Sequence, residues 1–460
     1  MFSSRWTRLA LACVMCTLPG LAHAQTGETN TRVFSSLFGG AATDMPGSVQ
    51  ALDFSAAVFG GYDDDIFARG SRPRTDAARL SGTFTGVQGG LQYRRRMARG
   101  SFGARAATAA RLVSSTGEFV TTFAAGQARY STDLTTRTST TIWQRVLYRP
   151  YFSVVPFATG STLGPSVEGV EPDDIADFAD GVDQGAGGES DFALAADREA
   201  IIYGGGGGLA RQLSIRSSLQ FTASYSTARF LQDDARTFGN VRWRAGGLYQ
   251  YRISRYLTFN AGYAYRQFLG KSGADAVNHD INLGVRYNQP FTFGRGRTTL
   301  SFTTGSTTLI RDRLEEEGGR GDRFIWRALG SATLRHDFSG PWQAQVSYIR
   351  SVGFLDGLTD PFVGDRVVAA LGGLLGRRTD VMFNAGYVTG SFGLRSRNFD
   401  TTIAGARIRT ALTRNLALFA QYFYYQYDFA PSIADTLFVP DGLERQGIRA
   451  GVTLWVPLVR

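Results

Sequence analysis

Apolar and polar residues alternate with a period of two along most of the chain, and residues 256–290 show this pattern most clearly. One set of alternate positions carries apolar and aromatic side chains, namely Leu257, Phe259, Ala261, Tyr263, Tyr265, Ile281, Leu283, Val285 and Tyr287. The positions between them carry mainly Thr, Asn, Gly and Arg. Because successive side chains leave opposite faces of a strand, this pattern predicts two β-strands joined by a polar link.

The same unit recurs along the chain and gives eighteen strand candidates. They cover residues 51–62, 80–94, 101–112, 120–133, 139–152, 200–212, 214–227, 239–252, 256–268, 279–290, 297–309, 324–337, 341–354, 365–376, 379–391, 399–411, 415–428 and 445–457. No helical period accompanies them that could cover their apolar faces. The sequence therefore predicts an all-β fold, a transmembrane antiparallel up-and-down β-barrel of about 18 strands (16–18), with lipid outside and water inside.

The links between the candidates alternate in length. Links after odd-numbered candidates are mostly longer, and the longest covers 153–199, whereas links after even-numbered candidates are short. Bacterial outer-membrane barrels have short periplasmic turns and longer external loops. With an even number of strands, this asymmetry predicts that both termini lie in the periplasm.

The first residues have the features of a secretory signal peptide. Arg5 and Arg8 precede an apolar run at 9–21, and Ala22-His23-Ala24 is a cleavage site of the A-x-A type. We expect residues 1–24 to be a signal peptide, 25–50 a periplasmic leader, and 51–460 a barrel in the outer membrane of a Gram-negative cell. The alternative is a lipoprotein signal with Cys13 as acceptor. Cys13 and Cys16 are the only cysteines, so the mature chain has no disulfide framework.

Composition agrees with a barrel and limits the partners. Gly accounts for 56 of 460 residues, and the 49 basic residues exceed the 39 acidic ones. Lys271 is the only lysine; a GC-rich genome explains this better than selection for bidentate anion binding does. The arginines are spread over alternating strands and are not clustered on one helix or arm, so nucleic-acid binding is not predicted.

If the apolar face of each strand points outward, the arginine-bearing face points inward. The predicted lumen-lining residues are Arg105, Arg111, Arg129, Arg242, Arg244, Arg252, Arg266, Arg286, Arg407 and Arg409. The predicted inward face also includes Arg145, Arg216, Arg327, Arg335 and Arg449. Few acids accompany them, Asp53 and Asp337 being the clearest. Arginine is costly on a lipid face, so this arrangement predicts a positively charged lumen.

Aromatic residues gather at the strand ends, where short turns such as 254–257 and 413–416 lead into them. The predicted membrane-interface residues are Tyr249, Tyr263, Tyr265, Trp342, Tyr348, Tyr387, Tyr422 and Tyr424. An amphipathic ring is stable at the lipid–water boundary. The alternative is that these rings are ordinary core aromatics.

Acidic residues are concentrated in the link 153–199. They include Glu171, Asp173, Asp174, Asp177, Asp180 and Asp183. Two hypotheses remain open for this segment. It is a solvated external loop, which could hold divalent cations between neighbouring lipopolysaccharides, or it folds into the barrel as a constriction whose carboxylates face the arginines. Its spacing matches no calcium loop, so no metal site is predicted.

Three smaller signals predict no separate chemistry. The run of glycines at 204–208 lacks the spacing of a nucleotide loop and fits a thin strand approached by a loop or plug. Asp63-Asp64-Asp65 fits solvated acids at a loop mouth better than a metal cluster. The pair His279-Asp280 is the one candidate for a surface hydrolase, but no nucleophile with an oriented base accompanies it. We expect no enzyme and no cofactor.

Short motifs resemble those of a known family. They are Gly60-Gly61-Tyr62-Asp63-Asp64-Asp65-Ile66-Phe67, Tyr148-Arg149-Pro150-Tyr151-Phe152 and the repeated Leu-x-Phe-x-Ala-x-Tyr strands. The chain resembles the outer-membrane β-barrel porin family associated with exopolysaccharide loci. The resemblance implies an outer-membrane barrel for saccharides or small solutes. One departure is the C-terminal residue, Arg460, where bacterial barrels commonly carry an aromatic residue that the assembly machinery reads.

These patterns together predict a porin-like channel for passive diffusion of small solutes, anions or saccharides among them. Its partners would be outer-membrane lipid, lipopolysaccharide and the barrel-assembly machinery; the sequence does not give the oligomeric state. Two alternatives stay open. One is an outer-membrane component of exopolysaccharide export, and the other is a non-conducting structural barrel with a filled lumen.

Overall fold

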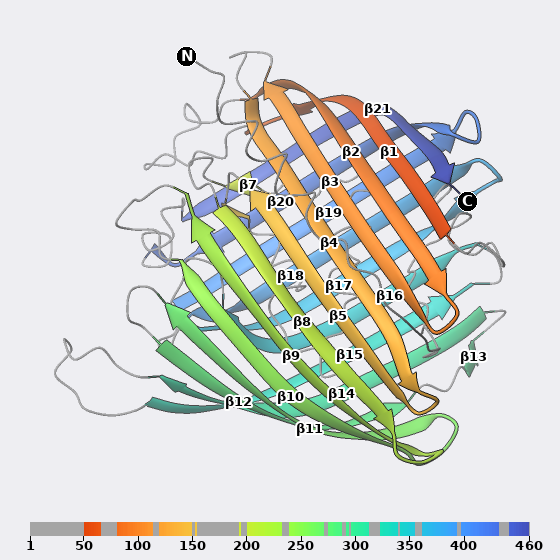
Figure 1. Cartoon of the computed structure of the whole chain (residues 1–460). Helices are drawn as coiled ribbons and strands as arrows, with labels where there is room; N and C mark the ends of the chain where they lie inside the picture. Colours follow the sequence, from red (N-terminus) through yellow and green to blue (C-terminus); the bar gives the residue numbers. More distant parts are fainter. Residues whose placement is uncertain are drawn as a thin grey trace.

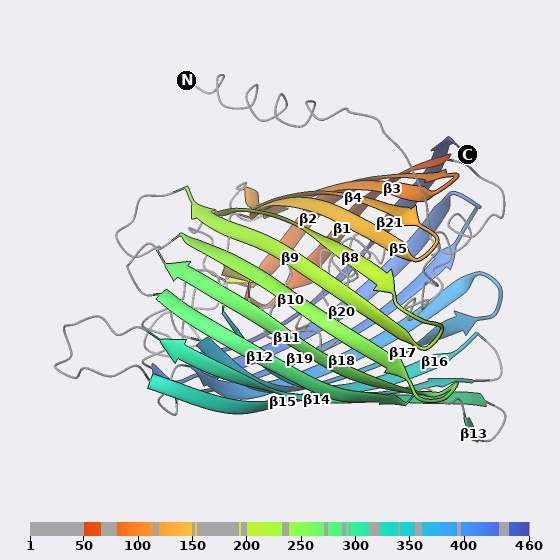
Figure 2. The ribbon, with the colours of Figure 1, turned by 60° about the horizontal axis from the view of Figure 1, so that its bottom comes forward.

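Eighteen strands pair antiparallel in chain order, and the last strand pairs with the first to close the ring (Figure 1). The computed structural model describes residues 50–65, 81–113, 119–149, 152–153, 193–194, 200–231, 239–270, 275–287, 291–293, 296–311, 323–338, 341–354, 361–392, 397–431 and 441–459. Figure 2 shows the sheet curving round on itself, with β14 and β15 on the side away from β1 and β2. The predicted barrel of eighteen antiparallel strands is thus confirmed. None of the described residues forms a helix long and apolar enough to cross a membrane.

The barrel strands are β1 (Gln50–Asp63), β2 (Gly82–Met97), β3 (Gly100–Val113), β4 (Phe119–Thr135), β5 (Thr138–Arg149), β8 (Ala200–Gln212), β9 (Ser217–Phe230), β10 (Asn240–Arg252), β11 (Leu257–Gly270), β12 (Asp275–Tyr287), β14 (Gly296–Arg311), β15 (Arg323–Asp337), β16 (Gln343–Phe354), β17 (Pro361–Leu375), β18 (Thr379–Phe392), β19 (Arg397–Ala411), β20 (Leu416–Phe429) and β21 (Gly442–Val459). Three short strands lie in the links: β6 (Phe152–Ser153), β7 (Ala193–Leu194) and β13 (Phe291–Phe293). β6 pairs with β7, and β13 pairs with β14.

Every barrel strand overlaps its predicted range, and the bounds differ by at most four residues. Two of these differences change the prediction. β5 ends at Arg149 and not at residue 152, because Pro150 has no N–H for the ladder. β12 begins at Asp275, four residues earlier than predicted, so the β11–β12 link is only 271–274 and the expectation of a long link there was wrong.

The short turns lie together at one end of the barrel, along the right side of Figure 1, where the C-terminus also lies. We call this the short-turn end and the opposite end the long-link end. Three of these turns share one design. The hydroxyls of Ser214, Ser254 and Thr413 each accept backbone N–H groups two and three residues ahead, at 3.0–3.2 Å. The turns at Ser254 and Thr413 were predicted from the sequence, and the turn at Ser214 repeats the same chemistry.

Glycines on the inner face let rings lie flat against the strands near the point of closure. A Cβ added at Gly86 would overlap the ring of Phe59, and one at Gly447 would overlap the ring of Phe423. The predicted thin strand at 204–208 lies within β8. The ring of Trp143 approaches Gly206 and would lie 2.9 Å from a Cβ added there. The backbone of β9 also lies close to this position.

Candidate functional site: the two faces of the barrel wall

The outer face of the wall is apolar and uncovered. Bulky side chains at alternate positions are strongly exposed, among them Val58 (63%), Ile142 (56%) and Leu283 (54%). The two sequence neighbours of Val58, Ala57 and Phe59, are on the opposite face and are buried. Soluble monomers rarely expose contiguous apolar patches beyond a few hundred Å², and this belt recurs on strands all round the barrel. The outer face is therefore suited to a hydrocarbon environment.

The belt has the height of a membrane. On β17 the outward residues between Asp365 and Leu375 are Val367, Ala369, Leu371 and Gly373. Ten residues at about 3.3 Å each, tilted by about 45°, span about 23 Å, which matches the apolar band of outer-membrane barrels.

Tyrosines bound to polar partners mark the upper edge of the belt, toward the long-link end. Tyr348 donates to Asp365 at 2.5 Å and Tyr387 to Asp400 at 2.8 Å. Tyr422 donates to Gln446 at 3.0 Å, and Tyr424 to Glu444 at 3.4 Å. Each pair joins neighbouring strands on the outer face. Carboxylates at this level require water or headgroups, so the apolar belt ends here.

The other predicted interface residues also lie on the outer face. Tyr263 contacts His279 Nδ1 at 2.7 Å, and the ring of Tyr265 lies 5.5 Å from the same histidine. Tyr249 is 36% exposed near the short-turn end of β10. Trp342 lies over Gly373, where an added Cβ would meet its ring at 2.6 Å. Their position at a lipid–water boundary remains a prediction.

The inner face carries the arginines. Nine of the ten predicted lumen-lining arginines face inward by strand register: Arg105, Arg111, Arg129, Arg242, Arg244, Arg252, Arg266, Arg407 and Arg409. The tenth, Arg286, pairs with Thr258 through its backbone, and its side chain lies outside the described residues. Whether this set lines an aqueous lumen stays a prediction.

Several inward arginines are packed against the wall. Arg409 is 2% exposed and binds Asp380 through Nη2 at 2.5 Å, and Arg266 binds Asp280 at 2.6 Å. Asp280 also accepts the hydroxyl of Thr307. Asp280 and Asp380 were not among the predicted inward acids, although the alternation in each strand places them on the inner face. The inner wall therefore holds neutralised pairs as well as positive charge.

Arginine nevertheless outnumbers acid on the inner faces of the described strands. By register the inward acids there are Asp53, Asp63, Asp133, Asp280, Asp337 and Asp380. Further inward arginines, beyond those set out above for the wall, include Arg94, Arg366 and Arg445 and the predicted Arg145 and Arg449. The described wall thus carries a net positive charge.

An aromatic surface that was not predicted from the sequence covers the inner wall near the closure. The inward side chains of β20 include Phe419, Phe423, Tyr425, Tyr427 and Phe429, all at most 4% exposed. Guanidinium groups lie over neighbouring rings: Arg111 over Phe84 at 4.8 Å and Arg449 over Phe59 at 5.3 Å. Arg449 also donates to Gln421 at 2.7 Å. Cation–π contacts of this kind stabilise buried arginine without an acid.

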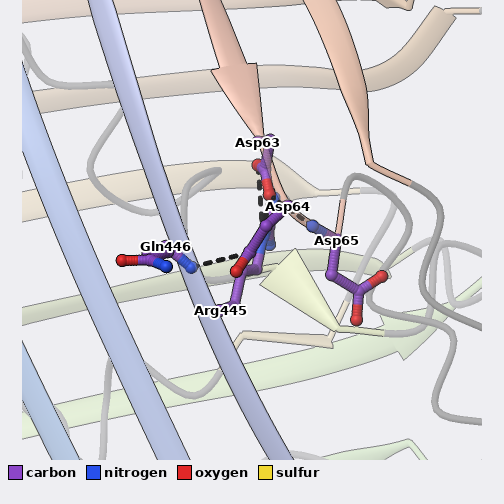
Figure 3. Close-up of polar contacts among 5 residues, drawn as sticks. All are labelled: Asp63, Asp64, Asp65, Arg445 and Gln446. Carbon is purple, nitrogen blue, oxygen red and sulfur yellow. Dashed lines mark hydrogen bonds and ion pairs between the residues drawn. The ribbon is translucent and has the colours of Figure 1, made fainter. Parts of the chain in front are cut away.

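The closure between β1 and β21 is fastened at the long-link end by the predicted loop acids (Figure 3). Arg445 binds Asp63 with Nε at 2.9 Å and Nη2 at 2.5 Å. Asp64 exchanges two hydrogen bonds with the backbone of Gln446, at 3.1 and 2.8 Å. Asp63 and Asp65 are 1% and 3% exposed, so the prediction that this triplet is solvated was wrong for both. We call these contacts the closure clasp.

The positions of His279 and Asp280, the predicted candidate pair for a surface hydrolase, can be given. His279 faces outward and Asp280 inward, because consecutive strand residues alternate, so they cannot act as a catalytic pair. The acidic residues Glu171, Asp173, Asp174, Asp177, Asp180 and Asp183 lie outside the described residues. No group of His, Cys, Asp or Glu in the described part of the chain is arranged to hold a metal ion.

Known proteins resemble this chain in fold only. No protein-family model and no curated protein sequence matches it. Similar solved structures include Pseudomonas aeruginosa OpdQ (11% identity, TM-score 0.43) and Pseudomonas aeruginosa OccK2 (OpdF) in complex with glucuronate (11%, 0.44), each covering 89% of this chain and 98% of its own. Acinetobacter baumannii OccAB4 (10%, 0.41) covers 89% of this chain and 99% of its own. Similarity at this level does not carry a function across, so the function must follow from the barrel itself.

Proposed function

We propose that this chain is an outer-membrane channel for the passive diffusion of small solutes. The observation that supports it is the closed ring of eighteen strands with an apolar outer belt and an arginine-rich inner face. Only a closed barrel satisfies every backbone group of strands in lipid. Barrels of about 16–18 strands are wide enough to leave an aqueous channel.

The proposed orientation follows from the two ends. The short-turn end, where β1 begins and β21 ends, would face the periplasm, and the long-link end would face outward. The signal peptide, residues 1–24, would be removed after export, so that the mature chain begins at Gln25. The tyrosine–carboxylate pairs would then lie at the level of lipopolysaccharide headgroups. Insertion would depend on the barrel-assembly machinery.

The inner-wall charge supports a preference for anions, with acidic saccharides and small carboxylates as the substrate class. Fixed positive charge in a low-dielectric channel raises the local anion concentration. Arginine also binds carboxylates with two parallel hydrogen bonds. Export of exopolysaccharide rests on the family resemblance alone.

We expect the purified chain to form open channels in planar lipid bilayers and to select anions. Under a salt gradient, the sign of the reversal potential should show that anions cross more readily than cations. This preference for anions should weaken at higher salt concentration, because salt screens the charge of the arginines. In liposome swelling, glucuronate should enter faster than glucose and glucose faster than glucosamine, since the three differ little in size. Cation selectivity, or glucosamine entering first, would contradict the proposal.

A non-conducting structural barrel is the second candidate, and a specific observation favours it. Large inward side chains near the closure, including Arg449 and Tyr425, are 1% exposed, so this part of the inner wall is covered. If the whole lumen is filled in this way, the same liposomes will be impermeable to all three sugars. If the folded barrels show neither liposome swelling nor bilayer conductance, the result would favour the structural barrel over the channel.

A further inference from the structure

The ladder between β15 and β16 stops halfway. Their register runs from Asp337↔Gln343 at the short-turn end to Gly330↔Arg350, and no pairs follow. β16 nevertheless continues to Phe354 and pairs with β17 over its whole length. β15 likewise continues to Arg323, and among the described residues this part of it pairs with β14 alone. The two strands therefore separate toward the long-link end. The gap begins beyond the level of Tyr348 and Asp365, where the apolar belt ends, so its free backbone groups do not face hydrocarbon.

Burial shows which strand has left the wall. Ser351 and Val352 of β16 point to opposite faces, yet they are 6% and 1% exposed. Trp326, Arg327 and Ala328 of β15 also alternate between faces, and all three are exposed. The tip of β16 is thus covered on both sides, while the facing segment of β15 stands free on both sides. This asymmetry places the β16 tip inside the ring.

One contact holds the tip there. Nη1 of Arg266 on β11 donates to the backbone carbonyl of Val352 at 3.1 Å. In the wall, β12, β14 and β15 separate β11 from β16, so this bond must run across the interior. Nη2 of the same guanidinium binds Asp280, which is fully buried and accepts from Thr307. A polar chain from β14 to β12 to β11 therefore ends on the β16 backbone.

With the β16 tip inside the barrel, a buried polar side chain close to Arg266 has no hydrogen-bond partner among the described residues. Asn278, directly opposite Arg266 on β12, is fully buried, and neither its amide oxygen nor its amide nitrogen has a hydrogen-bond partner among the described residues. A buried polar group without a hydrogen-bond partner destabilises the arrangement that buries it. Exposure to water at this position would remove that destabilisation. Pairing of β16 with the free edge of β15 would add ladder hydrogen bonds.

We propose that the tip of β16, Ser351 and Val352, is a movable flap at the long-link mouth, latched inside the barrel by Arg266. In its second position it pairs with β15 in the same register, with Ala328 opposite Val352. That movement widens the mouth and exposes Asn278, Asp280 and Arg266 to solutes. The flap's role as a gate rests on the proposed channel function, but its movement does not.

Paired cysteines test the second position, because both native cysteines lie in the predicted signal peptide. Ala328→Cys with Val352→Cys would be opposite each other only when the flap is outward. Leu334→Cys with Val346→Cys, already opposite in the ladder and on the same face, is the matched control. We expect rapid oxidation of the control pair in intact barrels and slower oxidation of the test pair. Arg266→Gln with Asp280→Asn removes the latch without leaving a buried charge, and should speed the test pair at least about tenfold, since a charged hydrogen bond contributes about 1.5–3 kcal/mol.

Three outcomes would overturn the proposal. The first is no test disulfide in either background while the control pair forms. The second is equal oxidation rates with and without the latch. The third is a channel whose conductance is unchanged when the test pair is locked; the proposal requires a higher and steadier conductance that reverts on reduction. If no variant conducts, the channel function fails, and the disulfide rates still decide whether the flap moves.

Discussion

Arg445→Met is expected to destabilise the folded barrel by about 3–5 kcal/mol, because it leaves the carboxylate of Asp63 buried without its charge partner. Asp63 and Arg445 have side chains that are 1% and 3% exposed, and they join the first strand to the last. No turn connects β1 and β21, so this closure relies on side chains and backbone pairing alone. Urea unfolding of the barrel in lipid vesicles, followed by tryptophan fluorescence, measures the loss.

Two controls separate charge burial from simple loss of a contact. Asp63→Asn combined with Arg445→Met removes both charges and keeps an acceptor for the Asp65 amide, so it should recover most of the stability. Arg350→Met breaks the exposed pair with Asp365, whose side chains are 44% and 37% exposed, and should cost at most about 1 kcal/mol. If Arg445→Met lowered the free energy of unfolding by no more than Arg350→Met does, the closure clasp would stabilise the barrel no more than an exposed ion pair.

Leu371→Arg is expected to destabilise the barrel by about 2–4 kcal/mol, the cost of placing arginine on a lipid face near the midplane. Leu371 lies on the outer face of β17, about midway between Asp365 and Leu375, beside the exposed ring of Phe383. The guanidinium would have to leave water, and no acid lies next to it in the ladder. The same vesicle unfolding assay gives the free-energy difference.

The neighbouring residue provides the matched control. Ala370 lies on the inner face of β17, between Gln345 and Asn384 in the ladder. Ala370→Arg introduces the same side chain one residue away, toward polar groups and water, and should change stability by less than about 1 kcal/mol. Equal costs at the two positions, or a larger cost at Ala370, would show that the two faces are not lipid and water.

The fold could be predicted from the sequence because each strand carries its own signal. Alternation at residues such as Tyr263 and Arg266 defines both the strand and its faces, and the short turns at Ser254 and Thr413 repeat one hydroxyl motif. Strand ends depend on weaker signals. Only Pro150 gave a physical reason to end a strand early, and the ladder at β12 extends past the polar residues that suggested a loop.

The inner site was less predictable, because its chemistry depends on which strands meet. Asp63 is buried against Arg445, which lies 382 positions away in the sequence. No local pattern indicates that partner. Aromatic residues occur on both faces of β20, so alternation alone could not show that Tyr425 and Tyr427 lie inside while Tyr422 and Tyr424 lie outside. The contact between Arg266 and Val352 follows from an interrupted ladder, which the sequence does not show.

Accessibility of spin labels along β5 and β17 tests the two-faced barrel most directly, since the mature chain is predicted to lack cysteine. Labels would replace Ile142, Val146 and Leu371 on the outer face, and Arg145 and Ala370 on the inner face. In lipid vesicles, the first set should collide with dissolved oxygen and be protected from a water-soluble nickel complex. The second set should show the reverse. Equal nickel access at both sets, or the inverted pattern, would contradict a wall with hydrocarbon outside and water inside.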